Sequence, residues 1–207
     1  MNEKEIFSYI YENKGWGPGE SISGPGSSLE ATKFLTRELF FLIQKYKFKS
    51  ILDIPCGDFN WMKNIDLSGI DYLGADIVDL LIQGNIVKYP QSKFTVLNVL
   101  KDPLPPVDLV ICRDCLFHFP TDDVLMALKN IKNSGSKFLL TTSFGWKSWP
   151  NIDIAMGEFR RLNLELSPFA LPPPYERIIE GNTEFERQAG SQADRSMCLW
   201  ACKDLPS

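Results

Sequence analysis

Short apolar runs of strand length alternate along the chain with longer stretches whose apolar residues recur at helical spacing. Residues 2–14 predict a short amphipathic helix of this kind. A longer helix is expected to begin at Ser28, as its N-cap, and to end near Tyr46. Its buried stripe is predicted to comprise Leu29, Phe34, Leu35, Leu39, Leu42 and Ile43.

Five apolar runs predict the strands of a parallel sheet, because they are separated by helices or loops and several end in a polar residue. They cover residues 50–54, 72–77, 94–98, 108–113 and 137–142, and helices are expected at 78–86 and 121–131. Two last strands, 177–180 and 197–201, are expected to close the sheet in antiparallel fashion. The pattern therefore predicts an α/β fold with a mostly parallel, seven-stranded sheet, helices on both faces and an antiparallel C-terminal strand.

The turn after the first strand resembles a nucleotide-binding corner. Asp53 ends the strand, Pro55 ends the apolar run, and Gly57 begins a turn that is expected to open a helix at Asp58. Glycine tolerates positive φ and has no Cβ, so the backbone at Gly57 is expected to approach a ligand closely. An ordinary strand, turn and helix packed into the core is the alternative.

The type of ligand follows from the charges at this turn. A pyrophosphate site needs further glycines in a G-x-G-x-x-G pattern, which Pro55 and Phe59 interrupt. The carboxylates of Asp53 and Asp58 would repel a phosphate and favour a cationic ligand. S-adenosylmethionine (SAM), which carries an ammonium and a sulfonium group, fits this requirement.

Two polar residues at the tips of the next strands extend the predicted site. Asp76 ends the second strand, where an acidic residue binds a ribose diol in folds of this type. A role for Asp76 as N-cap of the following helix is the alternative, and both roles are compatible. Asn98 ends the third strand, and its amide is expected to contact an adenine edge.

A segment rich in glycine, serine and proline, GWGPGESISGPGSS, occupies residues 15–28. It is either a flexible linker or a lid over the cofactor, and Trp16 and Ile22 favour the lid, since large apolar residues are unfavourable in a linker. Residues 1–30 are thus expected to form an N-terminal helix and lid within a single domain, 1–207. Residues 144–175 are expected to form an insertion on the substrate side. Its aromatic residues, expected either to stack on a sugar or to pack in the core, are Trp146, Trp149, Phe169 and Tyr175.

Composition restricts the class of protein. The 207 residues are 44% hydrophobic, which suffices for one substantial core, and the net charge of −4 disfavours a nucleic-acid or anionic-membrane partner. Neither a signal peptide nor an apolar run of about 20 residues is visible, and the use of cysteine described next leads us to expect the reducing cytoplasm. The odd number of cysteines, five, does not predict disulfides. Cys112 and Cys115 lack a second pair or a histidine cluster, so no metal site is expected, and most cysteines are expected in the core.

Taken together, these motifs resemble the class I SAM-dependent methyltransferases, which have a Rossmann-like fold. More narrowly, the chain is similar to small bacterial methyltransferases that often accompany surface-glycan biosynthesis. The motifs shared with them lie in order along the chain: Trp16-Gly17 with Ser21, Ser23-Gly24 and Gly26-Ser27; DIPCGDFNWM from Asp53; Arg113-Asp114 with His118; and Arg161-Leu-Asn163-Leu164 with Pro168-Phe169. The chain departs from the methyltransferase pattern in its single glycine after the first strand and in Asn98, which replaces a common aspartate.

The resemblance implies a cofactor site for SAM. Asp53 and the backbone at Gly57, next to Pro55, would receive the methionine ammonium, Asp76 the ribose, and Asn98 with Val99 the adenine edge. The remaining expected contacts are Ile77 against the adenine, the backbone of Cys112 and Arg113 below the methionine, and Trp16 in the lid.

His118, the single histidine, is the candidate general base, because its ordinary pKa allows it to accept a proton near neutral pH. A structural histidine held between Phe117 and Phe119 is the alternative. Asp114 would orient its imidazole or else pair with Arg113. The expected reaction is O-methylation of a carbohydrate or another small acceptor. Other metabolites, a lipid headgroup, a nucleic acid, or a non-catalytic SAM-binding partner subunit remain alternatives, and the sequence does not indicate the oligomeric state.

Overall fold

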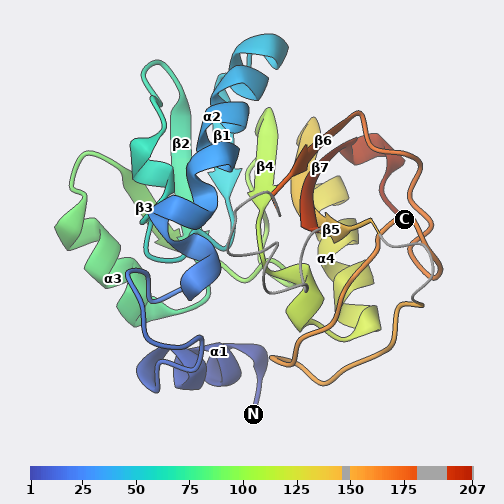
Figure 1. The fold of residues 1–207 in the computed structure, drawn as a ribbon, viewed down its shortest axis with the longest axis horizontal. Coiled ribbons are helices and arrows are strands. Elements are labelled where there is room, and N and C mark those ends of the chain that lie inside the picture. Colours follow the sequence, from blue (N-terminus) through green and yellow to red (C-terminus); the bar gives the residue numbers. More distant parts are fainter. Residues whose placement is uncertain (146–149, 181–194, 207) are drawn as a thin grey trace. The chain divides into compact units, whose positions relative to one another are not determined.

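The computed structural model describes residues 1–145, 150–180 and 195–206 (Figure 1). Within these residues, seven strands form a sheet in the order β3-β2-β1-β4-β5-β7-β6. The chain divides into two compact units, Met1–Val99 and Leu100–Ser207. The predicted α/β class and the antiparallel closure of the sheet are confirmed, because β7 runs antiparallel to both β5 and β6.

The first unit contains three strands, three α-helices and two short 3₁₀ turns. In chain order they are α1 (Glu3–Glu12), η1 (Pro25–Ser27), α2 (Leu29–Tyr46), β1 (Ser50–Asp53), η2 (Met62–Asn64), β2 (Asp71–Asp76), α3 (Asp79–Lys88) and β3 (Lys93–Val96). β1 pairs with β2, and β2 with β3, in parallel register. The carboxyl ends of these strands therefore share one edge, as the sequence predicts.

Helix α2 begins as predicted but buries a different stripe. The Ser28 hydroxyl accepts a hydrogen bond from the N–H of Ala31, which identifies Ser28 as the N-cap. The prediction for Leu29 is wrong, because this first helical residue lies at the end of the helix and is 41% exposed. Phe34 is only half-buried. Thr32 is buried instead, with its hydroxyl donating to the Ser28 carbonyl over 2.7 Å.

The helix expected at Asp58 is absent. Residues 55–61 form turns, followed by the single 3₁₀ turn η2. The reason is conformational: Gly57 has φ of 53° and Phe59 has φ of 58°, whereas an α-helix requires φ near about −60°. The aromatic ring of Phe59 packs on Tyr72, Tyr89 and Phe94 at 5.1–5.3 Å between centroids, which stabilises this conformation.

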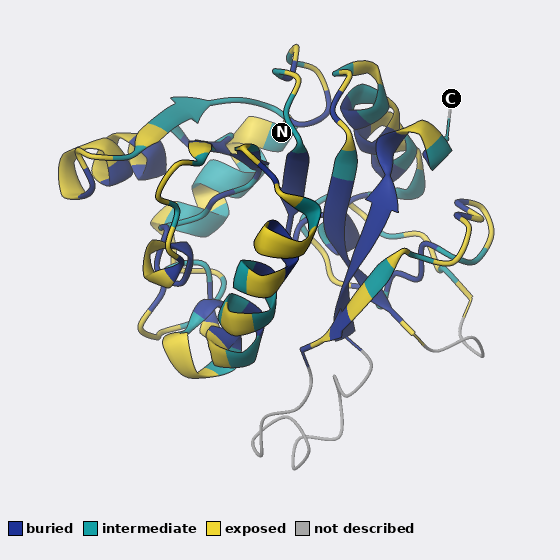
Figure 2. Cartoon of the chain, turned by 90° about the horizontal axis from the view of Figure 1, so that it is seen from above, coloured by how far each residue is buried: buried dark blue, intermediate teal, exposed yellow. Residues whose placement is uncertain are grey.

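The described residues of the second unit form the other four strands and one α-helix. Its elements are β4 (Leu109–Cys112), η3 (Leu116–His118), α4 (Thr121–Asn133), β5 (Phe138–Phe144), β6 (Glu176–Ile179), β7 (Arg195–Ala201) and η4 (Cys202–Asp204). β4 and β5 pair in parallel. Figure 2 shows the core strands of the protein in dark blue, while the helices alternate between buried and exposed colours along their turns.

Residues 150–175 follow an irregular path that side chains hold in place. The Asn151 amide donates to the carbonyls of Asn163 and Ser167, both at 2.9 Å. Phe169 is buried in the core and is not a stacking surface, and Tyr175 lies against Phe138, the first residue of β5 and so at its amino end. Core packing, the alternative to stacking on a sugar, is therefore confirmed for Phe169, whereas Tyr175 is 53% exposed. Trp146 and Trp149 lie outside the described residues.

All five cysteines are buried and none forms a disulfide, which confirms their predicted place in the core. In the part of the chain that the structure describes, no group of three or more cysteine, histidine or acidic side chains is placed to hold a metal ion. No helix among those residues is long and apolar enough to cross a membrane.

Candidate functional site

The carboxylate of Asp53 is buried at the end of β1. Asp53 is only 2% exposed, and its carboxylate accepts a hydrogen bond from the Tyr72 hydroxyl at 2.8 Å. Burial raises the pKa of Tyr72 well above its ordinary value, and the nearby Asp53 carboxylate raises it further. Tyr72 therefore remains a protonated donor and fixes one oxygen of Asp53.

Asp76, at the end of β2, is held by two backbone amides. The N–H of Gly57 donates to Oδ2 over 3.3 Å, and the N–H of Val78 donates to Oδ1 over 3.1 Å. Burial raises the pKa of Asp76 to about 6, although these backbone N–H groups oppose the shift. The prediction that Asp76 is the N-cap of the following helix is wrong, because Val78 is the N-cap of α3.

Gly57 connects three parts of the first unit. Its N–H binds Asp76, and its carbonyl accepts a hydrogen bond from the Asn85 amide at 2.7 Å. A Cβ at this position would lie 2.3 Å from the hydroxyl oxygen of Ser23. Glycine is thus favoured by the φ of 53° and also by the side chain that lies against it.

We call residues 15–28 the N-terminal collar. The carboxylate of Asp58 accepts hydrogen bonds from the Ser21 hydroxyl at 2.8 Å and from the Ile22 N–H at 3.1 Å. The Asn60 amide donates to Glu20 at 2.6 Å and to the carbonyl of Ser27 at 3.1 Å. The flexible-linker interpretation is therefore wrong. So is the expectation that Asp58 faces a cationic ligand, because the collar occupies both of its oxygens.

Apolar contacts place the collar and α1 next to the turn. Ile22, with Phe7 and Tyr11 of α1, packs against a buried cluster made up of Cys56, Val78, Leu81 and Ile82. Ile77, predicted to contact an adenine, packs on the same cluster. Lys4 and Asp79 form an ion pair of 2.6 Å between α1 and α3. Trp16 is half-buried, and a Cβ on Gly24 would lie 3.2 Å from its Cβ.

The other predicted cofactor residues of this unit flank these groups. Pro55 is half-buried between Asp53 and Gly57. Asn98, half-buried, follows Val96, which is the register partner of Asp76, and Val99 beside it is buried. The first unit thus brings the carboxyl ends of β1, β2 and β3 and their predicted side chains to one edge.

In the second unit, Arg113 and Asp114 belong to a buried charge cluster with Glu180 and Arg195. Arg113 donates to one oxygen of Glu180 through Nε at 2.9 Å and through Nη2 at 2.8 Å. Asp114 lies 3.2 Å from both Arg113 Nη1 and Arg195 Nη1. The predicted pairing of Asp114 with Arg113 is confirmed. The sequence did not lead us to Glu180 and Arg195 as members of this cluster. Their positions at the end of one predicted strand and just before another could have indicated buried charges.

Further contacts fix the backbone and the charge of this cluster. Asp114 has φ of 48°, and its N–H donates to the Thr142 hydroxyl at 2.9 Å. Burial alone would raise the pKa of Asp114, but the guanidinium groups of Arg113 and Arg195 outweigh this effect and hold it below its ordinary value. Cys112, at the end of β4, is buried, and its carbonyl accepts a hydrogen bond from Thr141 at 2.7 Å.

His118 is oriented by a backbone carbonyl. Its Nδ1 lies 2.8 Å from the carbonyl oxygen of Glu158, which can only accept, so Nδ1 carries the proton. In the neutral ring, Nε2 is then the basic nitrogen. Burial lowers the pKa of His118, opposed in part by the Glu158 carbonyl and the Asp114 carboxylate. The prediction that Asp114 orients the imidazole is therefore wrong, because the Glu158 carbonyl does so. Asp114 acts on the imidazole through its charge.

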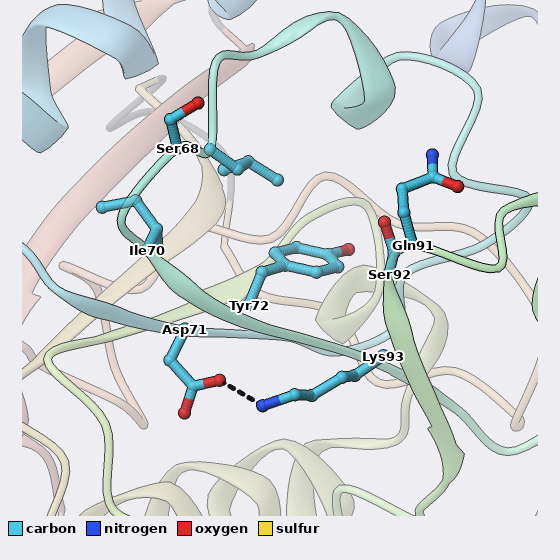
Figure 3. Close-up of a pocket in the computed structure, with 8 residues that line it drawn as sticks. Ser68, Ile70, Asp71, Tyr72, Gln91, Ser92 and Lys93 are labelled. Atoms are coloured by element: carbon cyan, nitrogen blue, oxygen red, sulfur yellow. Dashed lines mark hydrogen bonds and ion pairs between the residues drawn. The ribbon is translucent and has the colours of Figure 1, made fainter.

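A cavity of about 350 Å³ lies elsewhere in the first unit (Figure 3). It is at the amino ends of β2 and β3, where Asp71 and Lys93 form an ion pair of 2.7 Å. Its lining residues are Leu67, Ser68, Ile70, Asp71, Tyr72, Gln91, Ser92 and Lys93. None of the residues predicted to bind a cofactor lines it, and it is opposite the carboxyl ends that hold those residues.

Several solved structures with a similar chain path are methyltransferases. The magnesium protoporphyrin IX methyltransferase of Synechocystis PCC 6803, crystallised with SAM, is 12% identical with a TM-score of 0.62 over 97% of each chain. This chain has the class I methyltransferase fold. A SAM-dependent methyltransferase of Clostridium acetobutylicum is 13% identical with a TM-score of 0.58, covering 96% of this chain and 98% of that one.

A third similar structure is human N-acetylserotonin methyltransferase in complex with SAM. It is 15% identical, with a TM-score of 0.61 over 97% of this chain and 59% of the human one. At these identities the likeness establishes the methyltransferase fold alone. No protein-family model matches the chain, and no curated protein matches its sequence.

Proposed function

We propose that the chain is a SAM-dependent methyltransferase that transfers a methyl group to a hydroxyl oxygen of a sugar or another small acceptor. The observation that carries this proposal is the arrangement at the edge of the first unit. There the Asp76 carboxylate is bound by the Gly57 N–H next to the buried Asp53 carboxylate, within a methyltransferase fold. Acidic groups at the ends of the first two strands are suited to a nucleoside ligand with a cationic substituent.

The groups at this edge fit SAM better than a phosphate-bearing cofactor. Residues 53–61 contain no lysine or arginine, and the turn has one glycine. Asp53 and the Gly57 backbone, beside Pro55, would hold the ammonium, and Asp76 the ribose hydroxyls. Ile77, Asn98 and Val99 would contact the adenine, Trp16 would cover the cofactor, and the backbone of Cys112 and Arg113 would support the methionine. When bound, SAM supplies a methyl group activated by its sulfonium.

We assign His118 as the base that accepts the proton of the acceptor hydroxyl. The Glu158 carbonyl holds Nδ1–H at 2.8 Å and so presents Nε2 in its basic form. The ionised Asp114 stabilises the imidazolium that results, since opposite charges favour the protonated ring. The buried guanidiniums of Arg113 and Arg195 keep Asp114 ionised for this purpose.

The identity of the acceptor rests on the resemblance to bacterial methyltransferases of surface-glycan biosynthesis, which also supports a bacterial, cytoplasmic enzyme. A nucleic-acid acceptor is less favoured because the net charge is −4. The direct test has two stages. Calorimetry with SAM and with S-adenosylhomocysteine (SAH) tests the cofactor, and formation of SAH with a panel of sugars, nucleotide sugars, other small hydroxyl compounds and RNA tests the acceptor. Absence of binding to folded protein would refute the methyltransferase, whereas binding with no turnover would favour a partner subunit.

A further inference from the structure

We propose that the Ser23 hydroxyl donates a hydrogen bond to the carboxylate at the amino-acid end of the cofactor, and that Asp58 positions it there through the collar. This inference rests on the proposed function, because the ligand is the same SAM. It assigns a binding role to a residue of the N-terminal collar that the turn after β1 alone does not reveal.

The first step is the attachment of the collar to the turn. Asp58 accepts from the Ser21 hydroxyl at 2.8 Å and from the Ile22 N–H at 3.1 Å, so one carboxylate fixes two consecutive collar residues. Ser21 is 1% exposed, and its hydroxyl oxygen in turn accepts a hydrogen bond from the Ser23 N–H at 3.1 Å. The position of Ser23 is therefore determined by Asp58 through Ser21.

The second step is the location of the Ser23 side chain. Its hydroxyl oxygen would be 2.3 Å, and its Cβ 3.3 Å, from a Cβ built on Gly57, so the hydroxyl lies against the backbone of the cofactor turn. The residue is half-buried. Within the described residues, no hydrogen bond to the protein involves this hydroxyl, whereas the Ser21 and Ser28 hydroxyls are both bonded.

The third step is the chemical requirement of the ligand. The amino-acid end of SAM carries a carboxylate as well as an ammonium, and a carboxylate needs donors. The carboxylates of Asp53 and Asp76 at this edge serve as acceptors, and the N–H of Gly57 is already bound to Asp76. A hydroxyl from the collar, next to Gly57, supplies a neutral donor where the acidic strand ends supply none.

The decisive experiment compares two ligands that differ in the group concerned. SAH has the amino-acid end, whereas 5′-methylthioadenosine has the same nucleoside and thioether without it. Calorimetry would measure both dissociation constants for the wild-type protein and for Ser23→Ala. We expect Ser23→Ala to weaken SAH on the order of tenfold, the effect of losing one hydrogen bond to a charged group, and to leave methylthioadenosine unchanged. Ser92→Ala, a half-buried serine in the cavity at the amino ends of the strands, is the matched control.

A double-variant cycle tests the part assigned to Asp58. Asp58→Asn cannot accept from both Ser21 and Ile22, so it should also weaken SAH selectively. If Asp58 acts by positioning Ser23, combining Asp58→Asn with Ser23→Ala should weaken SAH no further than the stronger single variant. Additive losses would assign Asp58 a separate role and overturn the positioning part of the inference.

The remaining outcomes separate this inference from the function on which it rests. Equal losses for both ligands in Ser23→Ala would show that the residue only packs against Gly57. Unchanged affinity for both would show that it makes no contact with the cofactor, and either result leaves the methyltransferase proposal intact. If folded wild-type protein binds neither ligand, the proposed function is itself wrong, and the inference falls with it.

Discussion

The backbone N–H of Gly57 donates to the carboxylate of Asp76 over 3.3 Å, which links the turn after β1 to the tip of β2. Two features that lie 19 residues apart in the sequence thus form one structural unit. Any change at Asp76 therefore affects the glycine turn as well as a bound ribose. The variants below are designed to separate these two effects.

Replacement of Asp76 by alanine should weaken SAM binding several-fold without unfolding the protein. A hydrogen bond to a ribose hydroxyl contributes about 0.5–1.5 kcal/mol net, and the variant removes that acceptor. Calorimetry measures the affinity, and thermal melting measures the stability. Asp71→Ala, at the exposed amino end of the same strand, is the control and should leave affinity unchanged. Unchanged affinity in Asp76→Ala would limit Asp76 to its bonds with Gly57 and Val78.

Cofactor affinity should depend on pH through Asp76. The raised pKa, about 6, means that the carboxylate becomes protonated as the pH falls through 6. Protonation removes acceptor capacity, so SAH affinity should fall as the pH drops below 6 and level off at about the several-fold loss expected for Asp76→Ala. Stability should change in the opposite sense, because an acid with a raised pKa in the folded state stabilises the fold at low pH and loses that contribution as the pH rises through 6.

Calorimetry and melting between pH 5 and about 8 test both trends, and Asp76→Asn should abolish the Asp76 component of each. A wild-type SAH affinity that stays constant across that range would contradict an ionised Asp76 as the ribose acceptor. A stability that rises through pH 6 in the wild type but not in Asp76→Asn would contradict the raised pKa.

His118→Asn should lower turnover while keeping the fold and the SAM affinity. Asparagine retains hydrogen bonding to the Glu158 carbonyl but cannot accept a proton, and positioned proton transfer contributes about 10²–10⁴-fold. Because burial lowers the pKa of His118, the fall of wild-type turnover towards acid pH should occur at a lower pH than an ordinary histidine base would give. Steady-state rates as a function of pH provide the measurement.

Two other results would reassign His118. A lower melting temperature with turnover intact would make it a structural residue that satisfies the Glu158 carbonyl. Turnover and stability both unchanged at every pH would show that alignment of the acceptor suffices for methyl transfer and that His118 is not the base.

Gly57→Ala should destabilise the first unit more than Gly69→Ala. Both glycines have positive φ, 53° and 74°, but a Cβ on Gly69 meets nothing within 4 Å, whereas one on Gly57 meets Ser23. Backbone strain alone costs about 1–2 kcal/mol, so the difference in free energy of unfolding between the variants reports the contact with Ser23. Adding Ser23→Ala should recover part of the loss in Gly57→Ala, as measured by chemical denaturation. No recovery would show that the collar moves away from the turn.

Glu180→Ala should destabilise the second unit by about 3–5 kcal/mol. The substitution removes the oxygen that accepts from both Nε and Nη2 of the buried Arg113 guanidinium, and breaking a buried ion pair by removing one partner is strongly unfavourable. Lys137→Ala, which removes an exposed partner of Asp108, is the comparison and should change stability by less than about 1 kcal/mol. Equal effects in denaturation curves would show that the buried cluster contributes no more than a surface pair.

The sequence predicts what is periodic or local. The strands follow from apolar runs, the start of α2 follows from Ser28, and the acidic strand tips follow from Asp53 and Asp76. The absence of a helix after Gly57 was not predictable, because it depends on the positive φ of Phe59 and on aromatic packing.

Contacts between residues far apart in the sequence were equally unpredictable from the sequence. Asp58 meets Ile22 across 36 residues, and Arg113 meets Glu180 across 67. Residue type at either position indicates a charge or a donor but not its partner. Once the fold brings these segments together, the same residues determine which carboxylates remain available to a ligand.

The contact between Ser23 and Gly57 affects how a glycine at this turn should be interpreted in the sequences of related proteins. The Ser23 side chain fills the space beside Gly57. The N-terminal collar therefore favours glycine at this position even in a relative that no longer binds a cofactor. A glycine in this turn is therefore weak evidence of cofactor binding on its own. In relatives, the residues at positions 23 and 57 should instead vary together. A bulkier residue at one position should be tolerated only where the segment that carries the other has been shortened or displaced.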